Sequence, residues 1–238
     1  MHDKVGAILF SAGYGSRLGH LTINTPKVLL PIKGDPILKI WIDKLMDIDV
    51  RLILINTHYL SEKINEFVLN NYNNNSKLKT VYEPKLLGTA GSLIKHISMF
   101  SEFETIIFIH TDNYSDIDIR DFIECHLSRP KKARYTMGIF KPLNFVGCGM
   151  LEVGSDGMAT AYEEKPTSTR YEWANAGVFA SDVSEILSLK AKNLDLSDFS
   201  RDFIPSNISE FYTYKINVTH IDIGTNDNYL FANNSRNI

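Results

Sequence analysis

The fold is decided near the start of the chain by the stretch VGAILFSAGYGSRL, residues 5–18. Its first part, Val5–Phe10, is an apolar run of the length of a buried strand. The part that follows contains Gly13 and Gly15, which indicate a tight turn where that strand ends. Such a turn would expose several backbone N–H groups to a polyphosphate.

Further apolar runs alternate with helical patterns in the first half of the chain. Strands are expected at Leu52–Ile55 and Thr105–Ile109, and helices at Ile37–Met46, Ser61–Tyr72 and Thr89–Met99. This βαβαβα order predicts an α/β fold with a parallel sheet covered on both faces. In such sheets ligands bind beyond the carboxyl ends of the strands.

The second half has a different pattern. Short strands are expected at Tyr135–Phe140, Cys148–Val153 and Met158–Glu163, with Gly154–Gly157 as a turn between the last two. The Asn-rich stretch Asn70–Ser76 indicates an exposed loop after a helix. We therefore expect one α/β domain over residues 1–238 that includes a small β-rich subdomain.

Composition narrows the classes of partner. The 238 residues are 44% hydrophobic, and the formal charge of −3 comes from 25 basic and 28 acidic residues that are well mixed. Without a basic stripe, a small substrate is favoured over nucleic acid. The two cysteines form no CxxC pair, residues 1–10 lack the features of a signal peptide, and no apolar run approaches the ~20 residues that cross a bilayer. A cytoplasmic protein without a membrane partner is expected.

Cationic side chains accompany the glycine turn. Arg17 supplies a cationic fork, and Lys27 lies between two prolines whose restricted backbone would hold its ammonium near the same strand end. The turn lacks the GK[ST] ending of a Walker loop, and Leu18 occupies the last glycine position of a dinucleotide motif. Asp35 belongs to a turn rather than to a ribose-binding position. Taken alone, the glycines could serve only the turn.

Two acids have the sequence context of metal ligands. Asp112 follows an apolar strand, which suits Mg²⁺ bound together with substrate phosphates, although an Asp at this position is often a turn former or helix cap. Asp222 lies between Ile221 and Ile223, where its burial would be costly unless a cation or hydrogen bonds neutralised it. The histidines show no zinc-site spacing.

Two further segments carry polar residues beside strands. Residues 83–91, EPKLLGTAG, follow a strand and open a helix with Thr89 as the expected N-cap, and the small residues would let a flat base lie against the backbone. A simple loop and cap is the alternative. Glu164 and Lys165, read alone, indicate a solvated charge pair at a strand end.

In combination these segments resemble the sugar-1-phosphate nucleotidylyltransferase family. The matching motifs are G-x-G-[ST]-R-L and T-P-K-x-L-x-P within residues 11–31, L-G-T-A-G at 87–91, E-K-P at 164–166, N-A-G at 175–177 and D-I-G-T at 222–225. They span roughly residues 5 to 232 in the family's order. The chain departs from many members at Ala12-Gly13, where those have Gly-Gly.

The resemblance implies a Rossmann-like, mainly parallel sheet of the nucleotide-diphospho-sugar transferase (GT-A-like) kind. Residues 1–130 would mainly bind NTP and residues 131–238 mainly the acceptor. It implies NTP contacts from Ser11, Ala12, Gly13, Gly15, Ser16, Glu83, Gly88 and Thr89, with Arg17 and Lys27 as catalytic residues and Asp112 and Asp222 as ligands of one Mg²⁺. It also implies that Glu164, Gly149 and Asn175 contact the sugar and that Lys165 binds the acceptor phosphate.

The implied activity joins a nucleoside monophosphate from an NTP to a sugar 1-phosphate and releases pyrophosphate. L-G-T-A-G favours GTP with a mannose- or heptose-type 1-phosphate, whereas Ala12-Gly13 keeps open a cytidylyltransferase, including one for a non-sugar phosphate. Two other classes stay open, a non-catalytic regulatory subunit that binds sugar nucleotides and a Rossmann-like domain for another nucleotide. Many relatives are dimers or tetramers, so a homo-oligomer is an open expectation. The chain ends about where the catalytic domain should, at 233–238, so no appended β-helix is expected.

Overall fold

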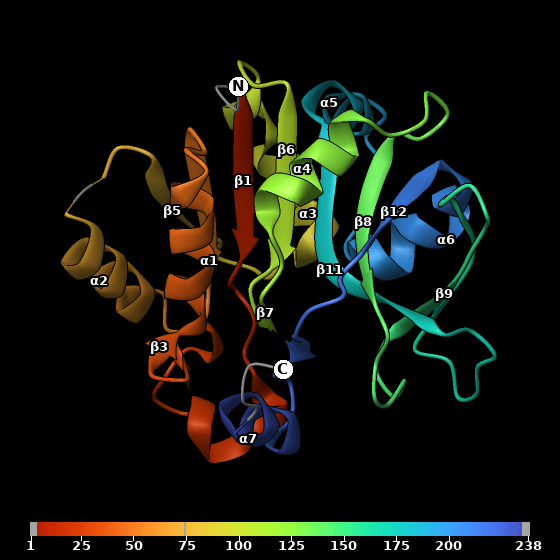
Figure 1. The fold of residues 1–238 in the computed structure, drawn as a ribbon. Coiled ribbons are helices and arrows are strands. Elements are labelled where there is room, and N and C mark those ends of the chain that lie inside the picture. Colours follow the sequence, from red (N-terminus) through yellow and green to blue (C-terminus); the bar gives the residue numbers. More distant parts are fainter. Residues whose placement is uncertain (1–3, 74, 235–238) are drawn as a thin grey trace. The chain divides into compact units, whose positions relative to one another are not determined.

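The computed structural model describes residues 4–73 and 75–234, which form two compact units (Figure 1). Unit 1 comprises the residues up to Leu86, Phe108–Ile117 and the residues from Val218, and unit 2 comprises Leu87–Ile107 and Asp118–Asn217. The expectations drawn from residues 1–3 and 235–238 lie outside the described residues.

Unit 1 is built on a parallel sheet. Its strands are β1 (Val5–Phe10), β4 (Leu52–Thr57), β5 (Leu78–Tyr82) and the last residues of β6 (Thr105–His110), in the order β6-β1-β4-β5. β1 pairs with β4 and β4 with β5, both in parallel. The strand β4 is buried along its whole length, as expected of an apolar run in a covered parallel sheet. Helices α1 (Ile37–Asp47) and α2 (Ser61–Tyr72) follow β3 and β4 in the chain.

Smaller elements complete unit 1. β2 (Pro31–Ile32) and β3 (Asp35–Pro36) form a hairpin whose turn residues Lys33 and Gly34 have φ angles of 53° and 100°. The turn predicted around Asp35 is therefore confirmed at Lys33 and Gly34, whereas Asp35 itself lies in β3. β7 (Asn113–Ser115) pairs antiparallel with β13 (His220–Asp222). The elements η1 (Ser16–Thr22) and η2 (Lys27–Leu29) are 3₁₀ turns, and α7 (Asn226–Asn234) follows β13.

Unit 2 is mainly antiparallel. Its strands are β8 (Tyr135–Phe140), β9 (Gly149–Val153), β10 (Ala159–Glu164), β11 (Trp173–Asp182) and β12 (Phe211–Lys215). β11 pairs antiparallel with β8 and β9, β9 pairs antiparallel with β10, and β12 adds to β8 in parallel. The other elements are α3 (Gly88–His96), η3 (Ile97–Phe100), α4 (Ile119–Leu127), α5 (Val183–Ala191), η4 (Phe199–Phe203), α6 (Ile204–Asn207) and η5 (Ile208–Glu210).

The core of unit 2 is aromatic. The rings of Tyr135 and Phe211 are stacked with centroids 4.9 Å apart, and those of Phe199 and Phe203 with centroids 4.8 Å apart. Offset aromatic pairs of this kind add to the stabilisation from area burial alone. The segment 199–211, which the sequence left unassigned, is therefore fixed to β8 by its own side chains.

The α/β class is confirmed, and the outcomes for single elements differ. The expected bounds of β1, α2 and β8 agree to the residue with those observed. The helix expected at Thr89–Met99 is instead α3 followed by the 3₁₀ turn η3. The expected cap at Thr89 is wrong, because α3 begins at Gly88 and the Thr89 hydroxyl accepts a hydrogen bond from the Phe199 N–H. Cys125 and Cys148 form no disulfide, and both are half-buried.

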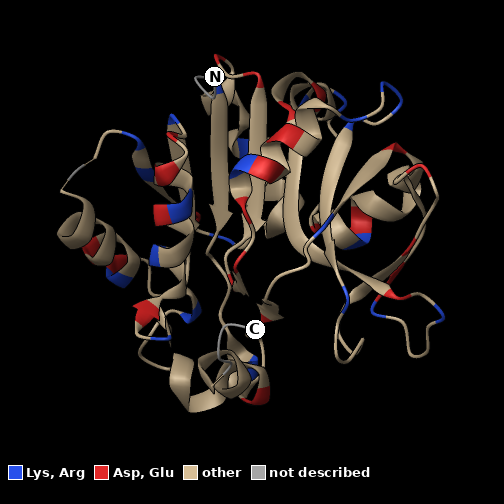
Figure 2. Ribbon diagram, in the orientation of Figure 1, with Lys and Arg blue, Asp and Glu red and all other residues tan. Residues whose placement is uncertain are grey.

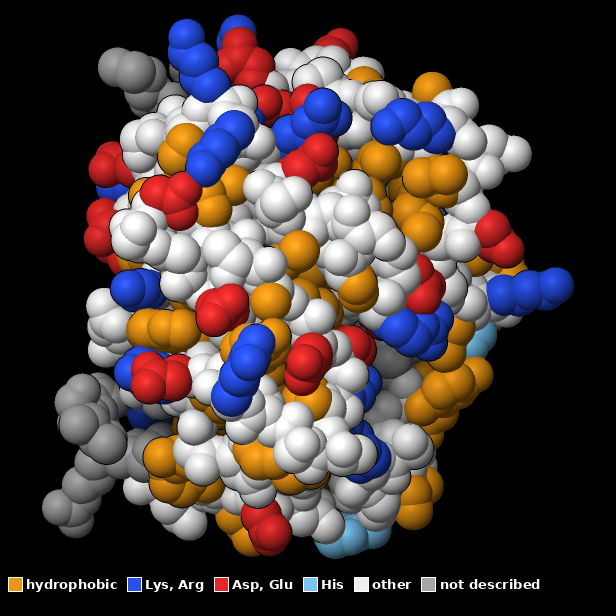
Figure 3. Space-filling view, turned by 90° about the vertical axis from the view of Figure 1, so that its right-hand side faces the viewer, with side chains coloured by type: hydrophobic (Ala, Val, Ile, Leu, Met, Phe, Trp, Pro, Cys, Tyr) orange, Lys and Arg blue, Asp and Glu red, His pale blue; other side chains and the backbone are white. Residues whose placement is uncertain are grey.

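Charged residues of both signs are interspersed along the chain (Figure 2). On the face that Figure 3 presents, basic, acidic and hydrophobic side chains are likewise mixed. Within residues 4–73 and 75–234, no helix is long and apolar enough to span a bilayer.

Candidate active site

The glycine turn of unit 1 begins with a buried serine. The Ser11 N–H donates to Asn56 Oδ1 at 2.7 Å, and the Ser11 hydroxyl donates to Thr111 Oγ1 at 3.2 Å. Asn56 comes from the carboxyl end of β4 and Thr111 follows β6, so three neighbouring strand ends are joined here. Ser11 and Ala12 are buried, and Ser11 thus anchors the start of the turn.

The two glycines of the turn have different surroundings. Gly15 has a φ of 67°, and a Cβ placed on it would lie 2.9 Å from Thr22 Cγ2 and 3.0 Å from Lys27 Cβ. A side chain there would be strained in the backbone and would collide as well. Gly13 has no other atom within 4 Å of such a Cβ, so its surroundings are open. Ser16 and Arg17 are exposed.

Lys27 connects this turn to the two acids. Its side chain is only 8% exposed, and Nζ lies 2.6 Å from Asp112 Oδ2 and 3.7 Å from Asp222 Oδ1. The backbone helps to hold Lys27 in this position, because Pro26 has a φ of −52° and the 3₁₀ turn η2 begins at Lys27. The position agrees with the expectation that the flanking prolines hold the lysine near the strand end.

The two acids are brought together by backbone pairing. Asn113 of β7 is in register with Asp222 of β13, and the Ile223 N–H donates to the Asp112 carbonyl oxygen at 3.2 Å. Ile221 and Ile223 are buried, but the Asp112 and Asp222 side chains are 38% and 40% exposed. As expected for an acid between two isoleucines, the Asp222 carboxylate has a cation and a hydrogen-bond donor nearby, Lys27 Nζ and the Gly224 N–H. Its apolar neighbours point into the core on the other side of the strand.

The pair has opposite pKa shifts. Desolvation opposes the charge of the Asp112 carboxylate, but the charges of Lys27 and His110 outweigh this effect and lower the pKa of Asp112 to about 2. The pKa of Asp222 is raised, first by desolvation and then by the neighbouring Asp112 charge. Two acids and one ammonium therefore share the site, and a further cation would relieve the repulsion between the carboxylates.

Gly224 allows a second cation to approach. A Cβ placed on Gly224 would lie 2.6 Å from an Arg17 guanidinium nitrogen and 2.8 Å from Asp222 Oδ1. The Gly224 N–H also donates to Asp222 Oδ1 at 2.7 Å. Only a residue without a side chain leaves room for Arg17 beside Asp222. This role of Gly224 was not inferred from the sequence, although the glycine lies within the D-I-G-T motif.

The donor set of this site fits Mg²⁺. Mg²⁺ is commonly held by one or two carboxylates together with substrate phosphates and water. Asp112 and Asp222 provide two partly exposed carboxylates beside Lys27, and among the described residues they belong to no cluster of three or more acidic, His or Cys side chains that could hold a metal. The remaining ligands of an ion there would come from substrate and water.

Glu83 lies behind the turn rather than at its surface. It is fully buried, and its Oε1 accepts a hydrogen bond from Asn56 Nδ2 at 3.3 Å. Because Asn56 also bonds the Ser11 N–H, Glu83 supports the turn through Asn56. Asn56 was missed because the strand was expected to end at Ile55, and a polar residue directly after an apolar run was the available signal.

In unit 2, Gly88 and Thr89 lie against residues 197–199. The Ser197 carbonyl oxygen accepts from the N–H groups of Ala90 and Gly91 at 2.9 and 3.3 Å. Gly88 has a φ of 74°, and a Cβ on it would lie 2.2 Å from that same oxygen. The start of α3 is therefore capped by the chain itself, which leaves the nucleoside contact of these residues a prediction.

The residues expected to contact the acceptor come together in unit 2. A Cβ on Gly149 would lie 2.0 Å from the Tyr162 hydroxyl oxygen, which donates a short hydrogen bond to Glu164 Oε2. Burial and the Glu164 charge raise the pKa of Tyr162. Asn175 Nδ2 donates to the Ser200 hydroxyl oxygen at 3.1 Å. Ser200 was missed because no sequence spacing connects it to Asn175, whereas Tyr162 lies two residues before Glu164 in β10, so the two side chains share one face of the strand.

Lys165 follows β10 in an unusual backbone conformation. Its φ is 48°, its side chain is 65% exposed, and Nζ lies 3.5 Å from Glu164 Oε1. A non-glycine residue in this region of φ is uncommon, and such residues often lie at ligand sites. The ammonium is thus free to move toward a ligand, and its contact with an acceptor phosphate stays a prediction.

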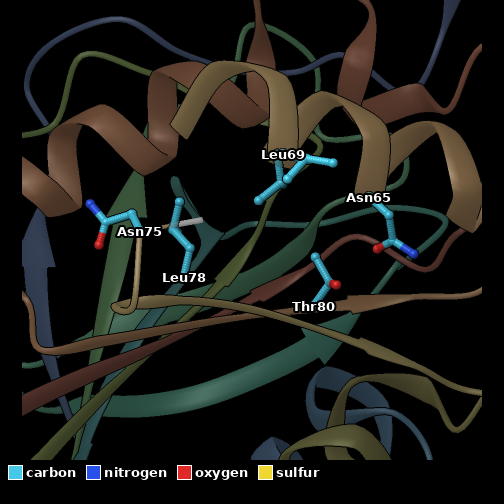
Figure 4. Close-up of a pocket in the computed structure, with 6 residues that line it drawn as sticks. Asn65, Leu69, Asn75, Leu78 and Thr80 are labelled. Carbon is cyan, nitrogen blue, oxygen red and sulfur yellow. The ribbon is translucent and has the colours of Figure 1, made fainter. Parts of the chain in front are cut away.

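A separate cleft of about 150 Å³ lies between α2 and β5 in unit 1 (Figure 4). It is lined by Asn65, Val68, Leu69, Asn75, Leu78 and Thr80. None of the expected site residues lines it, so it is not part of the candidate site.

The chain is similar in sequence and in fold to known proteins. The chain is 27% identical over 227 residues to D-glycero-alpha-D-manno-heptose 1-phosphate guanylyltransferase of Aneurinibacillus thermoaerophilus, with 94% of each chain covered. It is 25% identical to mannose-1-phosphate guanylyltransferase catalytic subunit beta of Drosophila pseudoobscura pseudoobscura, with 94% of this chain and 60% of that protein covered. Of several other curated relatives the chain spans between 40% and 62% of the length.

The fold is that of a solved structure, HddC from Yersinia pseudotuberculosis complexed with GMP-PN, with a TM-score of 0.78, 24% identity and coverage of 96% of this chain and 97% of that one. The sequence model of the nucleotidyl transferase family matches residues 6–237. A match over nearly the whole sequence, with the family's motifs placed at the ends of the strands, means that the chain belongs to the nucleotidyl transferase family.

Proposed function

We propose that this protein is a Mg²⁺-dependent sugar-1-phosphate nucleotidylyltransferase that uses GTP and a mannose- or heptose-type 1-phosphate. The observation that carries the proposal is the position of Lys27 between Asp112 and Asp222, beside an open glycine turn. The names of the mannose- and heptose-1-phosphate guanylyltransferases among its relatives support the choice of substrates.

The proposed reaction is a direct transfer. A phosphate oxygen of the acceptor attacks the α-phosphorus of the NTP, the bond to the β-phosphate bridging oxygen breaks, and pyrophosphate leaves with that electron pair. The attacking oxygen is already anionic, so the step needs no general base and no covalent enzyme intermediate. Catalysis then depends on positioning and on neutralisation of charge.

The residues of unit 1 supply that neutralisation. The backbone N–H groups at the open Gly13 turn would donate to phosphate oxygens. Arg17 and Lys27 would stabilise the negative charge that develops on the phosphates. Lys27 is held in place by its ion pair with Asp112, so little reorganisation is required of it. When bound by Asp112 and Asp222, Mg²⁺ would add Lewis-acid polarisation of the phosphoryl oxygens.

The residues of unit 2 suit a polyhydroxylated acceptor. Glu164 is 19% exposed, and it and Asn175 present hydrogen-bonding groups to sugar hydroxyls. The exposed ammonium of Lys165 would bind the acceptor phosphate. An NTP and a sugar phosphate are therefore the proposed partners.

The test is pyrophosphate release with Mg²⁺, measured for GTP, CTP, UTP, dTTP and ATP against mannose 1-phosphate, heptose 1-phosphates, other sugar 1-phosphates and non-sugar phosphates. We expect GTP with a mannose- or heptose-type 1-phosphate to give the highest kcat/KM. Activity with CTP alone would replace the guanylyltransferase proposal by the cytidylyltransferase alternative. Binding of NTP without turnover across the whole matrix would favour a regulatory subunit.

A further inference from the structure

Four aromatic side chains form a cluster beside the glycine turn of unit 1. They are Tyr14, His58, Tyr59 and Tyr82. Tyr14 and Tyr82 are 50% and 58% exposed, although large aromatic side chains usually bury most of their surface. None of these four residues has a role in the transfer step described above.

Hydrogen bonds hold the cluster in place. His58 Nδ1 lies 2.7 Å from the Glu83 carbonyl oxygen, which can only accept, so Nδ1 carries the proton. In the neutral ring Nε2 is then the acceptor, and the Tyr14 hydroxyl donates to it at 3.0 Å. Tyr59 is anchored separately, since its hydroxyl donates to the carbonyl oxygens of Thr22 and Ile23.

The rings of the cluster pack in two orientations, one stacked and one edge-on. The His58 and Tyr82 rings are nearly parallel, with an interplanar angle of 15° and centroids 6.3 Å apart. The Tyr14 ring is nearly perpendicular to His58, with an angle of 82° and centroids 5.5 Å apart. Because His58 and Tyr82 stack on one another and Tyr82 is the more exposed of the two, a flat π-system would stack on the Tyr82 ring. Of the two charged residues that follow Tyr82 most closely in the sequence, Glu83 is buried and Lys85 is exposed.

The sheet order places this cluster on one side of the glycine turn and the two acids on the other. Asp112 follows β6, Tyr14 follows β1, His58 follows β4, and Tyr82 ends β5, in a sheet with the order β6-β1-β4-β5. Because adjacent strands lie about 4.8 Å apart, the end of β5 is about 10 Å from that of β1. A nucleotide with its phosphates at the turn and the acids would extend its base in this direction.

We propose that His58, Tyr82 and Tyr14 form an aromatic platform that stacks the base of the nucleoside triphosphate and favours purines over pyrimidines. The proposal rests on the proposed function, since it assumes that the turn binds the phosphates of an NTP. A purine offers a larger π-face than a pyrimidine and so gains more from stacking on an exposed aromatic ring. Tyr14 links the platform to the phosphate-binding turn, because it belongs to both.

The test uses the full chain with Mg²⁺ and measures Kd for GTP, CTP and pyrophosphate by titration calorimetry. Tyr82→Leu removes one ring from an exposed position, and Tyr14→Leu removes the ring that meets His58 edge-on. Tyr82→Phe keeps the ring and should recover most of the affinity that Tyr82→Leu loses. Tyr72→Leu is the matched control, because Tyr72 lies on α2 in the same unit and its hydroxyl bonds Asp43.

We expect Tyr82→Leu to raise Kd for GTP about tenfold, since stacking of one base on an aromatic ring contributes about 1–3 kcal/mol. Tyr14→Leu should raise Kd for GTP by a smaller factor, because the Tyr14 ring meets the stack edge-on. In Tyr82→Leu, Kd for CTP should rise less and Kd for pyrophosphate should stay unchanged, and Tyr72→Leu should bind GTP like the wild type. A Kd for GTP within twofold of wild type in both Leu variants, with turnover intact, would overturn the platform alone. An equal rise for pyrophosphate would also overturn it, because the turn itself would then be damaged. If the wild-type chain binds no NTP, the proposed function fails and the platform with it.

Discussion

Lys27 Nζ lies 2.6 Å from Asp112 Oδ2, and the two residues are 85 positions apart in the sequence. The lysine comes from a 3₁₀ turn between two prolines and the acid from the end of β6, so two separate segments fix one ion pair. The pair lies beside the open glycine turn, and the shape of the backbone therefore determines where charge is concentrated in unit 1.

Lys27→Met should lower kcat for pyrophosphate release by about 100-fold or more, because one preorganised cationic donor to the developing charge is lost. Steady-state kinetics at saturating GTP and acceptor would measure this effect. Lys95→Met on α3 is the control, because Lys95 forms no salt bridge among the described residues. A kcat near that of the wild type would remove Lys27 from the mechanism.

Asp112→Asn should abolish Mg²⁺-dependent turnover, because the site would lose one of its two carboxylates and the counter-charge of Lys27. Turnover is measured as a function of Mg²⁺ concentration. Asp227→Asn, in the first turn of α7, removes the same charge elsewhere in unit 1 and should leave the Mg²⁺ dependence as it is. Normal turnover of Asp112→Asn would contradict a metal-binding role.

Gly224→Ala should lower kcat about tenfold or more with little change in stability. The added methyl would occupy the space where the Arg17 guanidinium lies beside Asp222, and Arg17 is exposed and can move away. The comparison with Arg17→Ala is informative, because both substitutions remove the same cation from the same place. If the double variant were much slower than either single variant, the two residues would act separately and this explanation would be wrong.

Gly88→Ala should destabilise the protein by about 1–3 kcal/mol, because φ is 74° there and the new methyl would meet the Ser197 carbonyl oxygen. Denaturant unfolding measures the change. Gly13→Ala has open space around its Cβ and an ordinary φ, so its free energy of unfolding should stay within about 0.5 kcal/mol of the wild type. Equal stability of the two variants would contradict the contact with Ser197.

His126 should make stability fall as the pH drops below about 6.5. Burial lowers the pKa of this histidine in the folded protein, although Asp182 opposes the shift, while Arg129 adds to it. The unfolded chain therefore takes up a proton at a pH where the folded chain does not, and stability present above the unfolded pKa is lost until the folded pKa is reached. The loss is at most about 1.4 kcal/mol per pH unit.

The control for this pH effect is His126→Gln, which lacks the ionisable ring and can still bond the Thr136 hydroxyl that lies 2.8 Å from His126 Nδ1. Free energies of unfolding at several values between pH 7.5 and 5 should fall more steeply in the wild type than in the variant. Parallel curves would show that another group titrates.

The sequence by itself determined several of the strands and the chemistry of the site residues. Apolar runs such as β1 and β8 were located to the residue, because a buried strand must be apolar along its length. The types and order of the motif residues were sufficient to indicate the family. The ten-residue strand β11 was not predicted, since its first part was interpreted only as a motif.

Only the tertiary structure decided which of these residues meet. Strand pairing places Asp222 beside Asp112 although the two acids are 110 positions apart, and the absence of a side chain at Gly224 leaves room for Arg17. The Thr89 hydroxyl, an expected helix cap, instead accepts a hydrogen bond from Phe199. Periodicity and propensity describe neighbours along the chain, whereas contacts between distant segments depend on register and on the space that each side chain leaves.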